Sequence, residues 1–205
     1  MIITITGPSC SGKTTLEAML KNEGFVNAIS TTSRPQRVGE VDGKTYYFRA
    51  PGTFEQMVRE GLMVEHVAFG GHYYGVSVEE VNRILATGKP VVIVCEPVGQ
   101  LQIKRYCTFH KLAYHSVFIC GEESVIAERF LNRFADELIA DKNGYTNQLV
   151  ETYARRLTEM MTTERDWVLD ANLCEDRYDS TFAFFDEESA PSIVRYLKHV
   201  AGVSA

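Results

Sequence analysis

The sequence predicts a three-layer α/β fold with a parallel-sheet core, an inserted mixed module and a helical lid. Short β-rich apolar runs alternate with helical stretches, a glycine-rich motif directly follows the first run, and two polar segments interrupt the alternation. Alternating strands and helices are typical of a parallel sheet that helices cover on both faces. We therefore expect one domain that spans residues 1–205.

The composition suits a single folded unit and limits its partners. The chain has 205 residues, of which 45% are hydrophobic and 23% charged, and its formal net charge is −6. A broad nucleic-acid surface would need a basic face, and this charge argues against one. No stretch reaches the roughly 18 apolar residues of a membrane span, and no basic leader precedes the first apolar run. We therefore expect no nucleic acid and no membrane as a partner, and a cytoplasmic location.

Strand and helix signals place the core elements in order. Residues Ile2–Thr6 form an apolar, β-rich run, and Thr14–Glu23 has helical spacing and ends at Gly24, so the chain begins with a strand, a loop and a helix. Three later apolar runs have strand length and are separated by helical stretches; they lie at Val91–Cys95, Ser116–Cys120 and Thr181–Phe185. The expected core comprises residues 1–29, 87–121 and 164–205.

Two segments between these core elements differ from them in composition. Residues 30–86 are rich in Arg, Gly, Tyr and Phe and contain short β-like pieces such as Thr45–Phe48, which indicates an inserted module that binds a substrate. Residues 122–163 are rich in Glu, Arg, Asn and Leu at helical spacing, so we expect two helices joined by a polar turn at Asp141–Gly144. We interpret this second segment as a lid.

The glycine-rich motif is Gly7-Pro-Ser-Cys-Ser-Gly-Lys-Thr14, which satisfies the P-loop pattern GxxxxGK[ST] directly after a strand and before a helix. Glycines let backbone N–H groups approach phosphate oxygens, and the helix N-terminus adds its positive end. Lys13 is predicted to bridge the β- and γ-phosphates of ATP, and the Thr14 hydroxyl to bind Mg²⁺. The predicted ATP-binding residues are Gly7, Pro8, Ser9, Cys10, Ser11, Gly12, Lys13, Thr14 and Thr15.

The motifs after the P-loop follow an order that resembles the guanylate kinase family. Ser30-Thr-Thr-Ser-Arg-Pro-Gln-Arg37 comes first, and it is followed by Gly39-Glu-Val-Asp-Gly-Lys-Thr-Tyr46, Val64-Glu65 and Tyr73-Tyr-Gly75. The resemblance is close over residues 1–100 and looser beyond. It implies a P-loop nucleoside monophosphate kinase that transfers the γ-phosphoryl group of ATP to GMP or dGMP, with Mg²⁺ as cofactor. We expect a monomer or homodimer.

By position, the family's GMP site falls on eight residues of this chain. Arg34 and Arg37 would grip the acceptor phosphate, because a planar guanidinium can donate paired N–H bonds to it. Glu65 would read the base, since a carboxylate accepts the adjacent N1–H and N2–H donors of guanine and repels the unprotonated N1 of adenine. The implied GMP-binding residues are Ser30, Arg34, Arg37, Tyr46, Glu65, Tyr74, Ser77 and Glu96.

The resemblance also implies arginines in the lid, which neutralise charge on the phosphoryl group during its transfer. These correspond to Arg129, Arg133 and Arg156 and, together with Lys13, make up the expected catalytic set. An acceptor phosphate is already an anionic nucleophile, so no general base is expected.

Some positions depart from the family pattern. Val94 stands where the first of two acidic residues is usual, and only the second remains, as Glu96. Val76 replaces the usual hydroxyl after Tyr-Gly, with Ser77 one place on. Aromatic residues occupy part of 178–186, where an asparagine that contacts adenine is common in the family.

Other functions remain open on the sequence. A kinase for another deoxynucleoside or modified-base monophosphate fits the same motifs, whereas Glu65 and Tyr46 argue against the related ribose-bisphosphate kinase, which has no base to read. A non-catalytic guanylate-kinase-like binding module belongs to a different class, and such modules commonly have a degraded P-loop, which is intact here. A P-loop ATPase without an acceptor site would not explain the arginines and tyrosines of residues 30–86.

Overall fold

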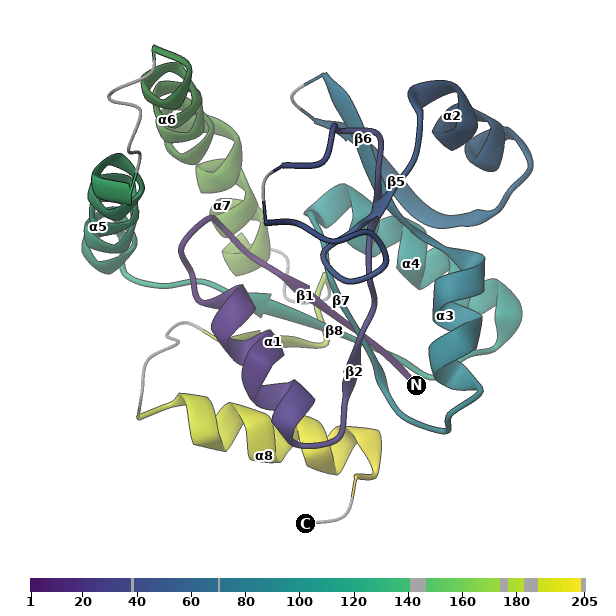
Figure 1. The fold of residues 1–205 in the computed structure, drawn as a ribbon. Coiled ribbons are helices and arrows are strands. Elements are labelled where there is room, and N and C mark those ends of the chain that lie inside the picture. The colour runs from purple at the N-terminus through teal and green to yellow at the C-terminus, as the bar shows by residue number, and fades with distance from the viewer. Residues whose placement is uncertain (38, 70, 141–146, 174–176, 183–187, 204–205) are drawn as a thin grey trace.

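A computed structural model describes residues 1–203 except 38, 70, 141–146, 174–176 and 183–187 (Figure 1). In chain order the elements are β1 (Ile2–Thr6), α1 (Lys13–Asn22), β2 (Val26–Asn27), β3 (Thr31–Thr32), β4 (Tyr47–Phe48), α2 (Pro51–Arg59), β5 (Met63–Phe69), β6 (His72–Ser77), α3 (Val78–Leu85), β7 (Val91–Val94), α4 (Pro97–His110), β8 (Tyr114–Ile119), α5 (Glu123–Ala140), α6 (Asn147–Glu159), the π-helix η1 (Met160–Glu164), α7 (Arg165–Leu173), β9 (Ser180–Phe182) and α8 (Ala190–Ala201). No helix in this described part of the chain is both long and apolar enough to cross a bilayer.

The core is a five-stranded parallel sheet in the order β2-β7-β1-β8-β9 (Figure 1). The central strand β1 is fully buried and pairs with β7 and β8, so that Ile2 lies level with Val91 and Tyr114. The predicted strands therefore form, with ends shifted by one or two residues. Of the last predicted strand, Thr181–Phe185, residues 181 and 182 lie in β9, and residues 183–185 are outside the described residues.

Helices cover both faces of this sheet and make three layers, as predicted. Ile3 and Ile5 of β1 pack against α1 and α8, while the alternate residue Ile2 packs on the other side against α3 and α4. The first face also buries Leu16, Leu20, Ile193 and Leu197, and the second buries Val81, Ile84 and Ile103. Each such side chain stabilises the fold by about 1.5–3 kcal/mol. This packing fixes the carboxyl end of β1, from which the P-loop emerges.

The inserted module contains a mixed four-stranded sheet in the order β4-β3-β6-β5. β6 is antiparallel to β3 and β5, and β4 is parallel to β3. Val64 and Val76 anchor this sheet in the hydrophobic cluster of α3 and α4. Glu80 of α3 adds a polar link, because its carboxylate accepts hydrogen bonds from the Ile29 N–H and the Tyr47 hydroxyl, each at 3.0 Å.

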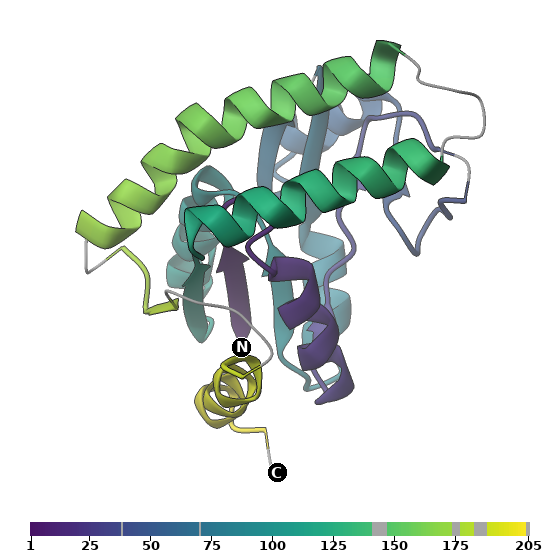
Figure 2. The same ribbon diagram turned by 90° about the vertical axis from the view of Figure 1, so that its left-hand side faces the viewer.

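The lid segment forms the two expected helices, which lie side by side across the top of Figure 2. Tyr153 of α6 packs its ring against Phe130 and Phe134 of α5, with centroid distances of 5.4 and 4.5 Å. The predicted polar turn at 141–144 lies outside the described residues. The second helix continues past residue 163 through η1 into α7, and we call this run, residues 147–173, the lid helix.

Candidate active site

The P-loop connects β1 to α1 through a backbone that needs glycine at its first position. At Gly7 φ is 153°, and a Cβ there would lie 2.0 Å from the carbonyl oxygen of Ile119 at the end of β8. Gly12, at 101°, caps the N-terminus of α1 in the left-handed region, and Cys10 adopts φ of 61°. The loop therefore folds tightly across the carboxyl end of the sheet, and the start of α1 lines a cavity there.

Lys13 lies against this loop. Its ammonium group donates to the carbonyl oxygens of Gly7 and Pro8, both at 2.7 Å. Burial lowers the pKa of Lys13, and the negative charge of Glu164 opposes that change. The side chain is thus held beside the phosphate-binding backbone by contacts that a phosphate could replace.

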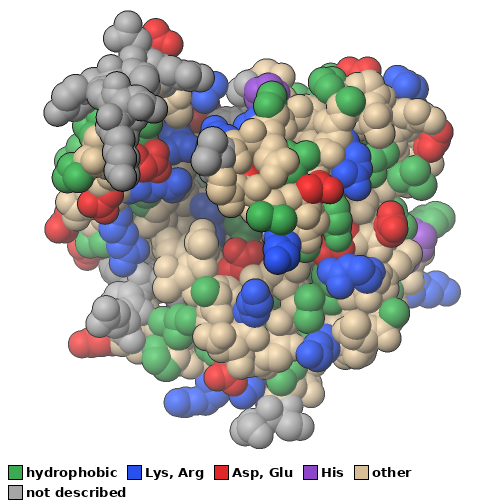
Figure 3. Space-filling model, viewed as in Figure 1, with side chains coloured by type: hydrophobic (Ala, Val, Ile, Leu, Met, Phe, Trp, Pro, Cys, Tyr) green, Lys and Arg blue, Asp and Glu red, His purple; other side chains and the backbone are tan. Residues whose placement is uncertain are grey.

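A cavity of about 840 Å³ opens in front of the P-loop, between the inserted module and the lid. In Figure 3 a hollow separates the helices at the left of the view from the rest of the molecule, and Lys and Arg side chains lie along it. The cavity brings together twelve of the predicted site residues: Gly7, Ser9, Lys13, Ser30, Arg34, Arg37, Tyr46, Glu65, Tyr74, Glu96, Arg133 and Arg156.

Arg34 forms the basic side of the inserted module and is only 9% exposed. Its guanidinium contacts Glu40 at 2.6 Å and lies over the Tyr46 ring, 5.6 Å from the centroid. The Tyr46 ring in turn meets Tyr74 edge-on at 6.2 Å. The Glu40 carboxylate also accepts the backbone N–H of Arg37 at 2.8 Å, so one anion organises both arginine positions. The aromatic rings limit the movement of the guanidinium and leave it near two hydroxyl groups.

Glu65 lies on β5 beside a β-bulge and is 5% exposed. Burial, and secondarily the charge of Glu96, raises the pKa of its carboxyl to about 7, while the Val76 N–H lowers it. Gly99 of α4 makes room for it, because a Cβ on Gly99 would lie 2.8 Å from Glu65 Oε2. A buried carboxylate with so few protein donors is poised to accept donors from a ligand.

Glu96 is the acidic residue closest in sequence to the strand end at Val94, and it occupies the N-cap position of α4. Burial raises the pKa of Glu96, and so do the charges of Glu164 and Glu159, whereas Lys13 lowers it. Val94 itself lines the cavity. Where the family usually has a second carboxylate, this site therefore presents an apolar wall.

Eight predicted residues do not line this cavity: Ser77, Arg129 and six residues of the P-loop and the start of α1, namely Pro8, Cys10, Ser11, Gly12, Thr14 and Thr15. The Ser77 hydroxyl accepts the backbone N–H of Glu80 at 3.2 Å and caps α3, since the chain turns from β6 into that helix at this point. The role of Ser77 as a GMP ligand stays a prediction. Arg129 lines a neighbouring cavity of about 740 Å³, where its guanidinium donates to the Cys10 carbonyl at 3.4 Å. That cavity is also lined by P-loop residues and the start of α1, namely Ser9, Cys10, Gly12, Lys13, Thr14 and Thr15.

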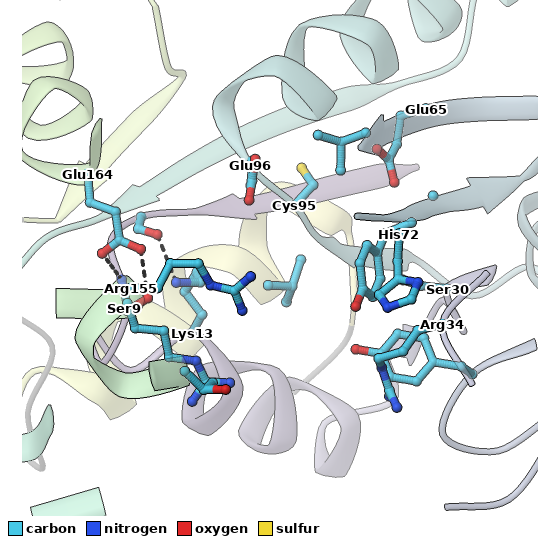
Figure 4. A pocket seen from close by; sticks show the side chains of 18 of the residues that line it. Ser9, Lys13, Ser30, Arg34, Glu65, His72, Cys95, Glu96, Arg155 and Glu164 are labelled. Carbon is cyan, nitrogen blue, oxygen red and sulfur yellow. Dashed lines mark hydrogen bonds between the residues drawn. The ribbon is translucent and has the colours of Figure 1, made fainter. Parts of the chain in front are cut away.

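The structure adds cavity residues that the predicted set did not contain. Arg155 and Glu164 of the lid helix are labelled in Figure 4. Arg155 precedes Arg156 in the sequence, and Trp167, further along the same helix, also lines the cavity. His72 stands two residues before Tyr74 on β6, so alternation along a strand could have placed both side chains on the same face. Glu164 gave no comparable signal, because its position depends on how the lid helix packs.

The fold and this site define a P-loop nucleotide-binding protein with a second, arginine- and tyrosine-lined module facing the loop. The family model for guanylate kinase matches residues 1–188. The guanylate kinase of Streptococcus mutans is 37% identical over 182 residues, which cover 80% of this chain and 86% of that protein. The chain belongs to the guanylate kinase family, and the predicted family and α/β fold are confirmed.

Other similarities are more restricted. The guanylate kinase of Lactococcus lactis is 43% identical over 106 residues, 51% of this chain and 52% of that protein. The chain thus spans about half the length of several curated relatives that it matches. The crystal structure of guanylate kinase from Anaplasma phagocytophilum superposes with a TM-score of 0.61 at 22% identity, covering 97% of this chain and 85% of the other, which shows the shared fold.

Proposed function

We propose that this protein transfers the γ-phosphoryl group of ATP to GMP or dGMP, giving ADP and GDP or dGDP. The observation that carries the proposal is that Lys13 of the P-loop and the buried Glu65 line one cavity, at opposite sides of the view in Figure 4. Such a cavity can hold donor phosphates at one end and a guanine base at the other. Membership of the guanylate kinase family supports the same assignment.

The acceptor is bound through its two ends. Arg34 and Arg37, with the hydroxyls of Tyr46 and Tyr74, would hold its phosphate, and a guanidinium matches that group with paired N–H donors. Glu65 would accept the N1–H and N2–H donors of guanine, and adenine offers no such pair. These contacts would hold the acceptor phosphate oxygen in line with the γ-phosphorus of ATP.

Catalysis would then be electrostatic, with no general base. Lys13 would bridge the β- and γ-phosphates, and Arg133 and Arg156, which line the same cavity from the lid, would act with it. The transition state spreads charge over the oxygens of the transferring group, and fixed cations near it stabilise that charge. Arg129, on the neighbouring cavity, is proposed to act from the donor side.

Thr14 is the proposed protein ligand for the Mg²⁺ that accompanies ATP. Across the described ranges, no group of three or more His, Cys, Asp or Glu side chains is placed to hold a metal ion by itself. Mg²⁺ commonly keeps several waters and uses one or two protein oxygens plus substrate phosphates, and the hydroxyl of Thr14 at the start of α1 suits that role. The bound ion would neutralise charge on the β- and γ-phosphates.

A coupled ADP-release assay with ATP and Mg²⁺ across all ribo- and deoxynucleoside monophosphates tests the proposal. The expected result is turnover with GMP or dGMP and at least about 100-fold lower kcat/KM with AMP, because Glu65 cannot pair with adenine. Equal use of AMP and GMP would refute the role of Glu65. Binding of GMP without any turnover would show a non-catalytic module instead.

A further inference from the structure

A carboxylate of the lid helix is seated on the P-loop. Glu164, the last residue of η1, accepts the backbone N–H of Ser9 at 2.8 Å through Oε2 and the Ser9 hydroxyl at 2.7 Å through Oε1 (Figure 4). Glu164 is only 8% exposed. Two hydrogen bonds from one residue to the two oxygens of a carboxylate fix both its position and its orientation.

This contact joins the two parts of the molecule that carry the proposed phosphate ligands. Ser9 belongs to the loop that holds Lys13, and Arg155 and Arg156 precede Glu164 in the lid helix. At 1.5 Å per residue, Arg156 lies roughly 12 Å along the helix from the contact. The point at which Glu164 meets the P-loop therefore determines how far both arginines reach over the cavity.

A π-helical turn, Met160–Glu164, follows the arginines and ends at the contact residue. Such turns interrupt α-helices mostly as single bulges and are frequent at functional sites. A π turn contains more residues than an α turn, so it changes the direction of the arginines relative to Glu164 around the helix axis. Arg155 and Arg156 line the cavity, and Glu164, at the end of this turn, reaches Ser9.

The contact also completes the support of the loop backbone. Lys13 binds the carbonyl oxygens of Gly7 and Pro8, and Glu164 binds the next N–H, that of Ser9. The carbonyl oxygens of Gly7 and Pro8 and the N–H of Ser9 therefore all have hydrogen-bond partners. Loss of the carboxylate would release the lid helix from Ser9, while Lys13 would still hold Gly7 and Pro8.

We propose that Glu164 is a positioning residue for phosphoryl transfer: by holding Ser9 it fixes the lid helix on the P-loop and so places Arg155 and Arg156 over the transferring group. This inference rests on the proposed kinase function. In this role Glu164 acts through the arginines and not through a contact with the nucleotide. Its removal should therefore lower kcat and leave the KM for ATP nearly unchanged, since the substrates still bind.

The kinetic test compares Glu164→Gln, Ser9→Ala and the double variant with the parent chain and with Glu128→Gln, which removes an exposed carboxylate elsewhere in the lid. We expect kcat to fall about 10- to 100-fold in Glu164→Gln, the range that a small misplacement causes, and the KM for ATP to change less than threefold. In Ser9→Ala kcat should fall less, because only the hydroxyl bond to Glu164 is lost and the backbone N–H bond remains. The double variant should have the kcat of Glu164→Gln within about twofold, since the Ser9 hydroxyl acts only through Glu164. An unchanged kcat would overturn the proposal. So would a lower KM for ATP at unchanged kcat, which would make Glu164 a competing internal anion.

Hydrogen exchange of the nucleotide-free protein separates this inference from the kinase assignment. Amides of residues 149–163 should exchange faster in Glu164→Gln than in the parent, and at the parent rate in Glu128→Gln, because only the former releases the lid helix. Unchanged exchange would overturn the anchoring role even if kcat fell. Faster exchange with normal kcat would make the contact purely structural and overturn the positioning role. If the parent phosphorylates no nucleoside monophosphate, the proposed function and the positioning role fail together, and the exchange result still decides whether Glu164 anchors the helix.

Discussion

Replacing Glu65 with Gln should stabilise the protein at alkaline pH. Burial and the neighbouring Glu96 raise the pKa of Glu65 from its ordinary value of 4.5 to about 7. A difference of this size corresponds to about 3 kcal/mol, at about 1.4 kcal/mol per pH unit. At pH 9 the folded parent carries this buried charge, and Glu65→Gln does not. The variant should therefore unfold with a free energy about 3 kcal/mol higher than the parent at that pH.

The sign of the pH dependence follows from proton binding. Because the folded state holds the Glu65 proton more tightly, it binds more protons than the unfolded state between pH 4.5 and 7. The parent should therefore lose stability as pH rises through this window, and the loss should be complete above about pH 7. Glu65→Gln should lack this loss, so the two proteins should converge in stability near pH 4.5.

Urea unfolding at pH 5, 7 and 9 measures these free energies, with Glu128→Gln as the control for removal of an exposed carboxylate. A constant difference between the parent and Glu65→Gln at all three pH values would refute the reasoning.

Glu65→Gln should also lose at least about 100-fold in kcat/KM for GMP, because its amide cannot accept both guanine donors. Together the two results would show that the buried charge of Glu65 lowers stability and is needed to bind guanine.

Three other changes test separate parts of the structure. Lys13→Ala should lower kcat by at least about 1,000-fold in the ADP-release assay without loss of folding by circular dichroism, because it deletes a cation aimed at the transition state; near-normal turnover would contradict its role. Arg34→Lys should raise the KM for GMP at least about tenfold with a smaller change in kcat, since the ammonium lacks the paired donors; an unchanged KM would place the acceptor phosphate elsewhere. Glu80→Gln should destabilise the chain to urea by about 2 kcal/mol at pH 7, because hydrogen bonds from Arg83, the Ile29 N–H and the Tyr47 hydroxyl outweigh the effect of burial and lower the pKa of Glu80. This contribution should be present above pH 4.5 and lost as pH falls through the lower folded pKa, and equal stability of parent and variant at pH 7 would argue against the link.

The sequence by itself determined the elements whose causes are local. An apolar run of five residues followed by the GxxxxGK[ST] spacing predicted β1, the P-loop and α1, because strand alternation, glycine geometry and helix periodicity all act over a few residues. Position in a family motif was enough to single out Arg34 and Glu65, which the structure places on one cavity. Such motifs predict residue types at fixed spacings.

Only the tertiary structure decided which of these groups meet across the chain. The contact between Glu164 and Ser9 joins residues 155 positions apart and depends on how the lid helix packs and where its π turn falls. Ser77 has a hydroxyl at a plausible place in the motif, yet the turn into α3 uses it as a helix cap. Arg129 lies on the neighbouring cavity rather than the main one, because its position follows from how α5 packs. The direction of a side chain from a helix or strand end is set by the rigid-body placement of the whole element, and short-range sequence patterns do not encode that placement.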